Sequence, residues 1–144
     1  MVNKIFLFFL VALISSASNA EGGKKPTSKK AKYETTAEYF ASLKNDQLCL
    51  KAGKIYRNTK NQESDVFKNM ETEINKRGLI KQEHLKWVFD KTLNLGANEC
   101  VIYAALGLPD GINRSVSAGS IHKQYVYGRT YIYTEDGIVT SWQD

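Results

Sequence analysis

The 144-residue sequence contains only two cysteines, two histidines and two prolines. No CxxC or HxxxH spacing occurs, and neither histidine lies near a cysteine, so the patterns that hold a structural zinc ion are missing. The sequence also lacks a nucleophile elbow, a P-loop and a dinucleotide-binding fingerprint, and it shows no internal repeat. We therefore expect no metal site, no cofactor and no catalytic residue.

Long apolar stretches are missing as well, apart from the single run Ile5–Ile14. A helix that crosses a membrane needs about 20 apolar residues, so this run is too short to be an anchor. Lys4 before the run, with the small residues Ser18 and Ala20 after it, forms the pattern of a secretory signal. The pattern predicts that residues 1–20 are removed by cleavage after Ala20. Because no cysteine follows directly, the mature chain is expected to be soluble, in the periplasm or secreted.

The formal net charge of +5 comes almost entirely from the region that follows this signal. Residues 21–32 hold five lysines and one glutamate, whereas the chain from Tyr33 onward holds 14 basic and 14 acidic residues. A neutral folded part argues against nucleic-acid binding. Residues 21–34 are predicted to be a disordered basic leader. The alternative is a weak contact of this leader with an anionic membrane or wall surface, at about 1 kcal/mol per lysine.

Cys49 and Cys100 are expected to form a disulfide, because two cysteines in an exported protein usually pair. The bond would close a loop of about fifty residues and stabilise the fold by roughly 4 kcal/mol in the chain-entropy model. The alternative is two separate buried thiols.

Helical periodicity dominates residues 35–92, which we interpret as a helical extension. One or two short helices are expected in its first part, with Asn45 as a candidate cap. An amphipathic helix is expected to begin after Ser64 and to stop at Gly78. The segment KQEHLKWVFDK predicts a third short helix.

In residues 93–144 the apolar period changes from helical to alternating. A helix is expected to begin at Asn98 and to end at Gly107. Four short runs rich in β-branched and aromatic residues follow, and Asp136-Gly137 predicts a tight hairpin between the last two. The predicted fold class is α+β, with short helices packed on a three- to four-stranded antiparallel sheet at the C-terminus.

The direction of the tyrosine side chains depends on the length of the turn at Gly128. A three-residue loop would gather all four tyrosines of the sheet with Trp142 on one face, whereas a two-residue loop would move Tyr125 and Tyr127 to the other. In either case, a regular hairpin at Asp136-Gly137 would place Tyr131 opposite Trp142.

Only one face of the sheet can lie under the helices. Burial of the large rings would contribute most to a core. Alternatively, Val126, Ile132 and Val139 form the core, and the exposed rings mark a partner site. The candidate partner-binding residues are Tyr125, Tyr127, Tyr131, Tyr133 and Trp142, with Asn113 and Arg114 at the start of the sheet.

Four other polar residues are given structural roles. His84 and His122 are expected to be surface or half-buried histidines. Asp110 and Asp136 are expected to be turn residues.

Glycine, proline, turn and sheet residues recur in a recognisable order from Leu93 to Asp144: Gly107, Pro109, Ile112, Asn113, Gln124–Gly128, Tyr131, Tyr133, Gly137, Val139 and Ser141–Gln143. This segment resembles the small bacterial envelope domains of the SmpA/OmlA type. The resemblance implies a helical layer over a three-stranded antiparallel sheet, as in one repeat of the β-lactamase inhibitor protein. It also implies protein–protein binding, with no cofactor and no catalytic residue.

These observations favour a soluble periplasmic module that binds or scaffolds proteins of the bacterial cell envelope without catalysis. One alternative is a secreted inhibitor of a hydrolase, of the β-lactamase or lysozyme type, which would insert a loop acid such as Asp136 into its target. The other alternative is a wall-associated hydrolase.

Overall fold

The computed structural model describes residues 34–58 and 62–144 of the chain. The predicted signal and the predicted basic leader, except its last residue, lie outside the described residues. Short helices come first and a four-stranded antiparallel sheet follows, so the predicted α+β class is confirmed. The helical elements are α2 (Ala37–Ser42), α3 (Asn45–Tyr56), α4 (Asp65–Lys76), the 3-10 turn η2 (Gln82–His84), α5 (Leu85–Asp90) and α6 (Glu99–Leu106). The strands are β1 (Gly111–Ser117), β2 (Ser120–Tyr127), β3 (Thr130–Glu135) and β4 (Ile138–Gln143).

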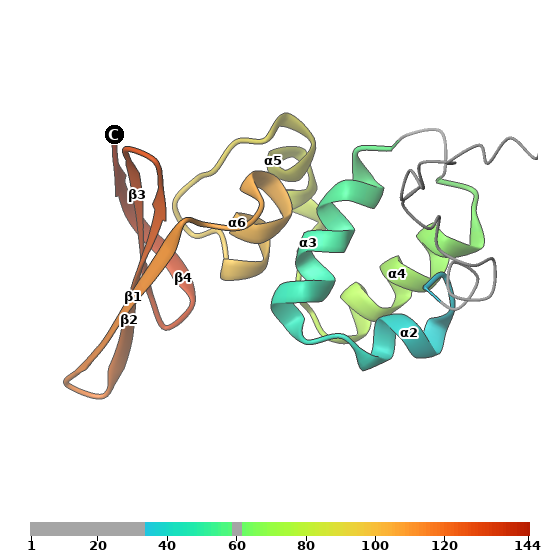
Figure 1. Ribbon diagram of the computed structural model, residues 1–144, viewed down its shortest axis with the longest axis horizontal. Coiled ribbons are helices and arrows are strands. Elements are labelled where there is room, and N and C mark those ends of the chain that lie inside the picture. Colours follow the sequence, from blue (N-terminus) through green and yellow to red (C-terminus); the bar gives the residue numbers. More distant parts are fainter. Residues whose placement is uncertain (1–33, 59–61) are drawn as a thin grey trace, which may run out of the picture.

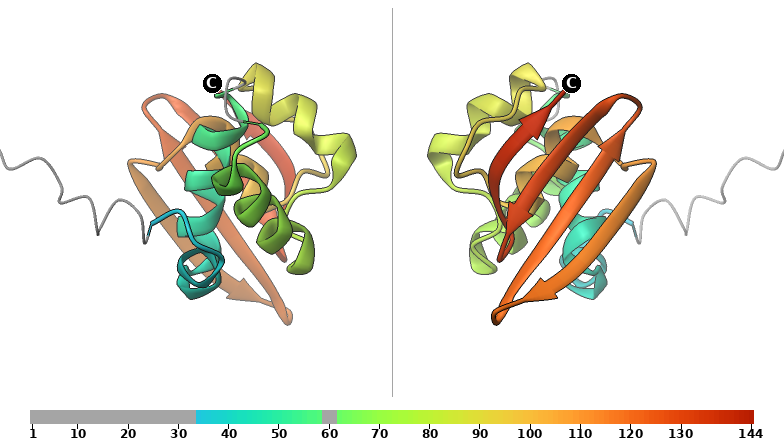
Figure 2. Two further views of the ribbon diagram at one scale, coloured as in Figure 1. Left: turned by 90° about the vertical axis from the view of Figure 1, so that its right-hand side faces the viewer. Right: turned by 90° about the vertical axis from the view of Figure 1, so that its left-hand side faces the viewer.

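The elements form successive layers (Figure 1). The sheet stands at one end, α6 lies next to it, α3 packs on α6, and α4 packs on α3 with α2 beside it. Figure 2 shows the sheet face-on, with the helices behind one face only. Among the helices of residues 34–58 and 62–144, none combines the length and hydrophobicity that crossing a membrane requires.

Capping residues set the helix boundaries largely as predicted. The Ser64 hydroxyl accepts a hydrogen bond from the backbone N–H of Phe67, which begins α4. The Asn98 side chain accepts one from the N–H of Val101, which begins α6. Asn45 is instead the first residue of α3 rather than its cap, and its side chain accepts a hydrogen bond from Arg77.

Arg77 holds α2 against the end of α4. Its guanidinium forms an ion pair with Glu73 at 2.6 Å. It also donates to three carbonyl groups at the end of α2, where the last carbonyls of a helix lack the N–H groups of a further turn. These carbonyls belong to Phe40, Ala41 and Leu43.

The sheet is a meander in the order β1-β2-β3-β4. Tyr127 pairs with Thr130, so the turn at Gly128 has two residues. Both Asp136 and Gly137 have positive φ, 47° and 82°, as the predicted tight hairpin requires.

The two predicted turn aspartates hold neighbouring turns through backbone hydrogen bonds. Asp110 accepts from the N–H of Gly128 at 2.7 Å. Asp136 accepts from the N–H of Ile121 at 2.8 Å. Each carboxylate therefore links one turn or loop to the adjacent strand pair, which confirms their predicted turn role.

A β-bulge interrupts the pairing of β3 with β4. Thr134 pairs with Val139, but Tyr133 pairs with Ser141, so Thr140 is an extra residue in β4. The bulge makes Trp142 the partner of Ile132. The prediction that Tyr131 lies opposite Trp142 is therefore wrong.

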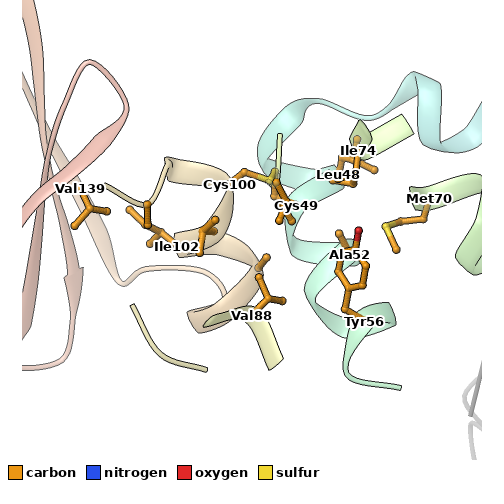
Figure 3. Packing of buried hydrophobic residues seen from close by; sticks show 14 of the residues in the cluster. Leu48, Cys49, Ala52, Tyr56, Met70, Ile74, Val88, Cys100, Ile102 and Val139 are labelled. Carbon is orange, nitrogen blue, oxygen red and sulfur yellow. A yellow bond between two sulfur atoms is a disulfide. The ribbon is translucent and has the colours of Figure 1, made fainter. Parts of the chain in front are cut away.

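One hydrophobic cluster extends from α2 to β4 (Figure 3). It contains Leu48 of α3, Met70 and Ile74 of α4, Ile102 of α6 and Val139 of β4, each at most 2% exposed. The predicted helical extension and the predicted C-terminal segment thus share a single core.

The closest helix contact joins α3 to α6. The predicted disulfide between Cys49 and Cys100 is confirmed. One turn further along α3, a β-carbon added to Gly53 would clash with the carbonyl oxygen of Ala104. Another turn on, Arg57 donates to the same oxygen at 2.6 Å. Because Cys49, Gly53 and Arg57 are four residues apart, they share one face of α3; we call this contact the α3–α6 seam.

Gly53→Ala is expected to lower the free energy of unfolding by at least about 2 kcal/mol, because the methyl group must push α3 away from α6. Denaturant titration of the purified mature chain measures this loss. Gly111→Ala is the matched control, because no atom lies within 4 Å of a β-carbon added there. Equal losses in the two variants would contradict the close approach at the seam.

Reduction of the disulfide is expected to lower the free energy of unfolding by roughly 4 kcal/mol, because the unfolded chain regains the freedom of a loop of about fifty residues. Denaturant titration with and without dithiothreitol measures the change. A chain carrying both Cys49→Ala and Cys100→Ala is the control and should not respond to the reductant. Wild-type stability that is unaffected by complete reduction would contradict the expectation.

Candidate binding surfaces of the sheet

The register divides the sheet residues between two faces. Tyr125 pairs with Ile132, and both are buried against the helices. Gln124 pairs with Tyr133, and Val126 pairs with Tyr131, so these four side chains point to the other face. We call this uncovered side the open face.

The two tyrosines of β2 are structural residues. Tyr125 is fully buried, and its ring meets the ring of Tyr103 of α6 edge-on, with centroids 5.8 Å apart. The Tyr127 hydroxyl donates to the carbonyl oxygen of Gly107 at 2.9 Å. Both tyrosines therefore hold the sheet on α6, and the arrangement with all four tyrosines on one face is excluded.

The structure combines parts of both predicted cores. Ile132 and Val139 are buried, as in one alternative, but Tyr125 is buried in the same cluster, as in the other. Val126 lies on the open face beside Tyr131. The two-residue turn at Gly128 explains this division of the tyrosines. Compared with a three-residue turn, it shifts β2 by one residue against β3, which moves Tyr125 and Tyr127 to the helix side.

A row of hydrogen-bonded side chains crosses the open face. The Asn113 amide on β1 donates to Gln124 on β2 at 2.8 Å. The Gln124 amide donates to the Tyr133 hydroxyl on β3 at 2.9 Å, and that hydroxyl donates to Gln143 on β4 at 3.3 Å. We call these four residues the polar row. It includes two predicted site residues, Asn113 and Tyr133, and connects all four strands.

A hollow of about 320 Å³ lies over the polar row. Besides Asn113, Gln124 and Tyr133, its lining includes His122 and Thr140. His122 is half-buried, as predicted. The open face therefore offers amide, hydroxyl and imidazole groups within one shallow area of rigid strands.

Trp142 lies apart from the polar row. It belongs to the edge strand β4, and the bulge turns its side chain toward the helix side of the sheet. It is 44% exposed. A groove of about 310 Å³ separates it from the loop before α6, with Leu93, Leu106 and Ile132 in its lining. Leu95 lies beside Trp142 in an adjoining hollow. This edge is a second, mainly apolar surface.

A larger hollow of about 650 Å³ lies on the helix side, where the disulfide and the first turns of α3 and α6 meet β2. Glu99 and Lys123 in its lining form an ion pair at 2.8 Å, so their charges balance. The neighbouring Tyr125 hydroxyl is buried without a hydrogen-bond partner among the described residues. Burial, followed by the nearby Glu99 carboxylate, raises the pKa of Tyr125 well above its usual range.

Arg114, the remaining predicted site residue, is exposed on β1. It lies opposite Lys123 in the strand register, so its side chain is on the helix side of the sheet. The predicted site residues thus occupy three places: Asn113, Tyr131 and Tyr133 on the open face, Trp142 and Arg114 at opposite edges, and Tyr125 and Tyr127 beneath the sheet.

In residues 34–58 and 62–144, no group of three or more histidine, cysteine or acidic side chains could hold a metal ion.

His84 differs from its predicted surface or half-buried position. It is only 5% exposed, and its ring stacks on Trp87 with centroids 4.4 Å apart. Its Nδ1 atom has no hydrogen-bond partner in the described part of the chain. Burial lowers the pKa of His84 below 6.5, and Lys81 lowers it further, while Glu83 acts in the opposite direction.

Comparison of the chain with protein-family models, with curated proteins and with solved structures found no match.

The lowered pKa of His84 predicts that the free energy of unfolding declines as the pH falls below about 6.5. In this range the unfolded chain binds a proton at His84, whereas the buried imidazole of the folded chain stays unprotonated. Denaturant titrations of wild type and His84→Gln between pH 8 and pH 5 measure this difference. The variant, which has no imidazole to protonate, should show a flatter decline over this range. Parallel curves for the two proteins would contradict the buried, neutral state of His84.

Proposed function

We propose that this chain is a non-catalytic module of the bacterial cell envelope, which binds a partner protein through the open face of its sheet. The polar row carries this proposal. Its four side chains are held to one another by hydrogen bonds of 2.8 to 3.3 Å, on strands that are fixed by a buried opposite face. A partner therefore meets side chains that are already ordered, which lowers the entropy lost on binding.

The composition of the open face suits a protein surface. Tyr131 and Tyr133 supply large rings with polar ends, the kind of residue that is enriched among interface hot spots. Val126 adds apolar area between them and β1. Asn113 and Gln143 end the row, and their amide groups have further hydrogen-bonding capacity for a partner.

The envelope location rests on the sequence. Residues 1–20 have the pattern of a secretory signal. The disulfide is compatible with an oxidising compartment such as the periplasm. The resemblance of Leu93–Asp144 to SmpA/OmlA-type domains supports a protein partner in the envelope and no nucleic acid. The basic leader would add a weak contact with an anionic membrane or wall surface.

The inhibitor hypothesis gains less support from the geometry. Asp136, the loop acid expected to enter a target enzyme, already accepts a hydrogen bond from Ile121 and has a positive φ in the β3–β4 turn. Its carboxylate therefore has a structural role in the hairpin. Inhibition of lysozyme or a β-lactamase at micromolar concentration, or lysis of wall material in a zymogram, would favour one of the alternative functions instead.

Tyr133→Ala is expected to weaken partner binding at least tenfold, because it removes the ring and breaks the row at its centre. Crosslinked capture of partners from an envelope fraction, followed by titration with the purified partner, measures this loss. Tyr133→Phe keeps the ring but removes the hydroxyl and should lie between wild type and Tyr133→Ala.

Leu108→Ala is the matched control, because Leu108 is 71% exposed in the loop before β1 and lies outside the polar row. It should bind like wild type. Capture of the same partners with unchanged affinity by Tyr133→Ala would overturn the proposal.

A further inference from the structure

β1 is the less protected of the two edges of the sheet. The start of β4 is covered by the segment before α6, since Gly96 donates to the Val139 carbonyl and Val139 donates to the Ala97 carbonyl. The bulge at Thr140 then distorts the remaining edge. No described segment pairs with the outer side of β1, and all its residues from Ile112 onward are exposed.

The sequence of β1 has little of the usual protection of an edge strand. Natural edges carry charged side chains, lysine above all, or proline, a bulge or a very short strand, which prevent another chain from pairing with them. β1 has seven residues, contains neither lysine nor proline, and pairs with β2 without a register shift. Its one charged side chain is Arg114, which would repel a basic strand but attract an acidic one. Its outward N–H and C=O groups can therefore accept a further strand.

Three side chains of β1 lie on the helix side of the sheet in a row that we call the edge row. In the strand register, Ile112 lies opposite the buried Tyr125, and Arg114 lies opposite Lys123. Lys123 forms an ion pair with Glu99 of α6. Val116 follows two residues later. Ile112 and Val116 are 45% and 58% exposed, so the row presents an apolar, a basic and an apolar side chain to solvent.

The charge of the edge row is not balanced. In the described part of the chain, the Arg114 guanidinium forms no hydrogen bond or ion pair, and the ammonium group of the neighbouring Lys123 forms an ion pair with Glu99. Lys44 and Asp46 both line the hollow next to Lys123, and their opposite charges offset each other. An acidic side chain placed beside Arg114 would therefore complete an opposite-charge pair across neighbouring strands.

We propose that β1 is a second binding site, which takes up an extended segment of another protein as a fifth strand. The segment has the pattern apolar–x–acidic–x–apolar, because alternate residues of an added strand lie beside Ile112, Arg114 and Val116. The site extends the proposed function but does not rest on it, since the edge row and the polar row are on different faces.

Two other occupants fit the edge row less well. A second copy that pairs symmetrically about Arg114 would place two arginines opposite each other, and like charges at that position are unfavourable. The basic residues 21–32 carry five lysines, which Arg114 would also repel.

The test uses the mature chain and two fluorescein-labelled peptides, TVTETVT and TVTKTVT, with binding followed by fluorescence polarisation. Wild type should bind the acidic peptide about tenfold more tightly, since an opposite-charge pair replaces a like-charge pair. Arg114→Glu should reverse this preference. Arg129→Glu, which changes another exposed arginine in the β2–β3 turn, is the matched control and should retain it.

Hydrogen exchange locates the peptide. Bound acidic peptide should slow exchange in Gly111–Ser117 and leave Ile138–Gln143 unchanged, and Tyr133→Ala should not alter the preference. Equal binding of both peptides, a preference that survives Arg114→Glu, or protection of β4 alone would overturn the proposal. Self-association that Arg114→Glu abolishes would also overturn it, in favour of a second copy as the occupant.

Discussion

The α3–α6 seam is the contact on which the rest of the structure depends. α6 lies between the sheet and the other helices, so its position on α3 decides where the sheet stands. Gly53 allows the two backbones to touch, Arg57 satisfies the carbonyl exposed at that point, and the disulfide fixes the adjacent turn. The three contacts lie on successive turns of one face of α3, so each of them holds the same pair of helices together.

The seam explains why one face of the sheet is left uncovered. With α6 held by α3 on one side, Tyr103, Tyr125 and Tyr127 join its other side to the sheet. Burial of these rings fixes the strands and their register, and the opposite face needs no cover. The polar row then orders the side chains of that free face. A small chain thus obtains a rigid surface from burial on one side only.

Much of the fold follows from local signals in the sequence. Ser64, Asn98 and Asp136-Gly137 set their boundaries through caps and a turn that depend only on neighbouring residues. The direction in which the aromatic side chains point does not follow from such local signals. No residue pattern marks the bulge at Thr140, which turns Trp142 away from the open face. The turn at Gly128 permits two lengths. His84 lies only three residues before Trp87, but nothing in the polar segment around it marks the stacked and buried ring that the structure shows.

NMR of the side-chain amides during titration with the captured partner shows whether the partner binds the open face. Binding at the open face predicts that the signals of Asn113, Gln124 and Gln143 shift or broaden. The signal of Asn69, which donates to the Thr35 carbonyl far from the sheet, should stay unchanged. Binding that leaves all three signals of the polar row unchanged would contradict the proposed binding surface.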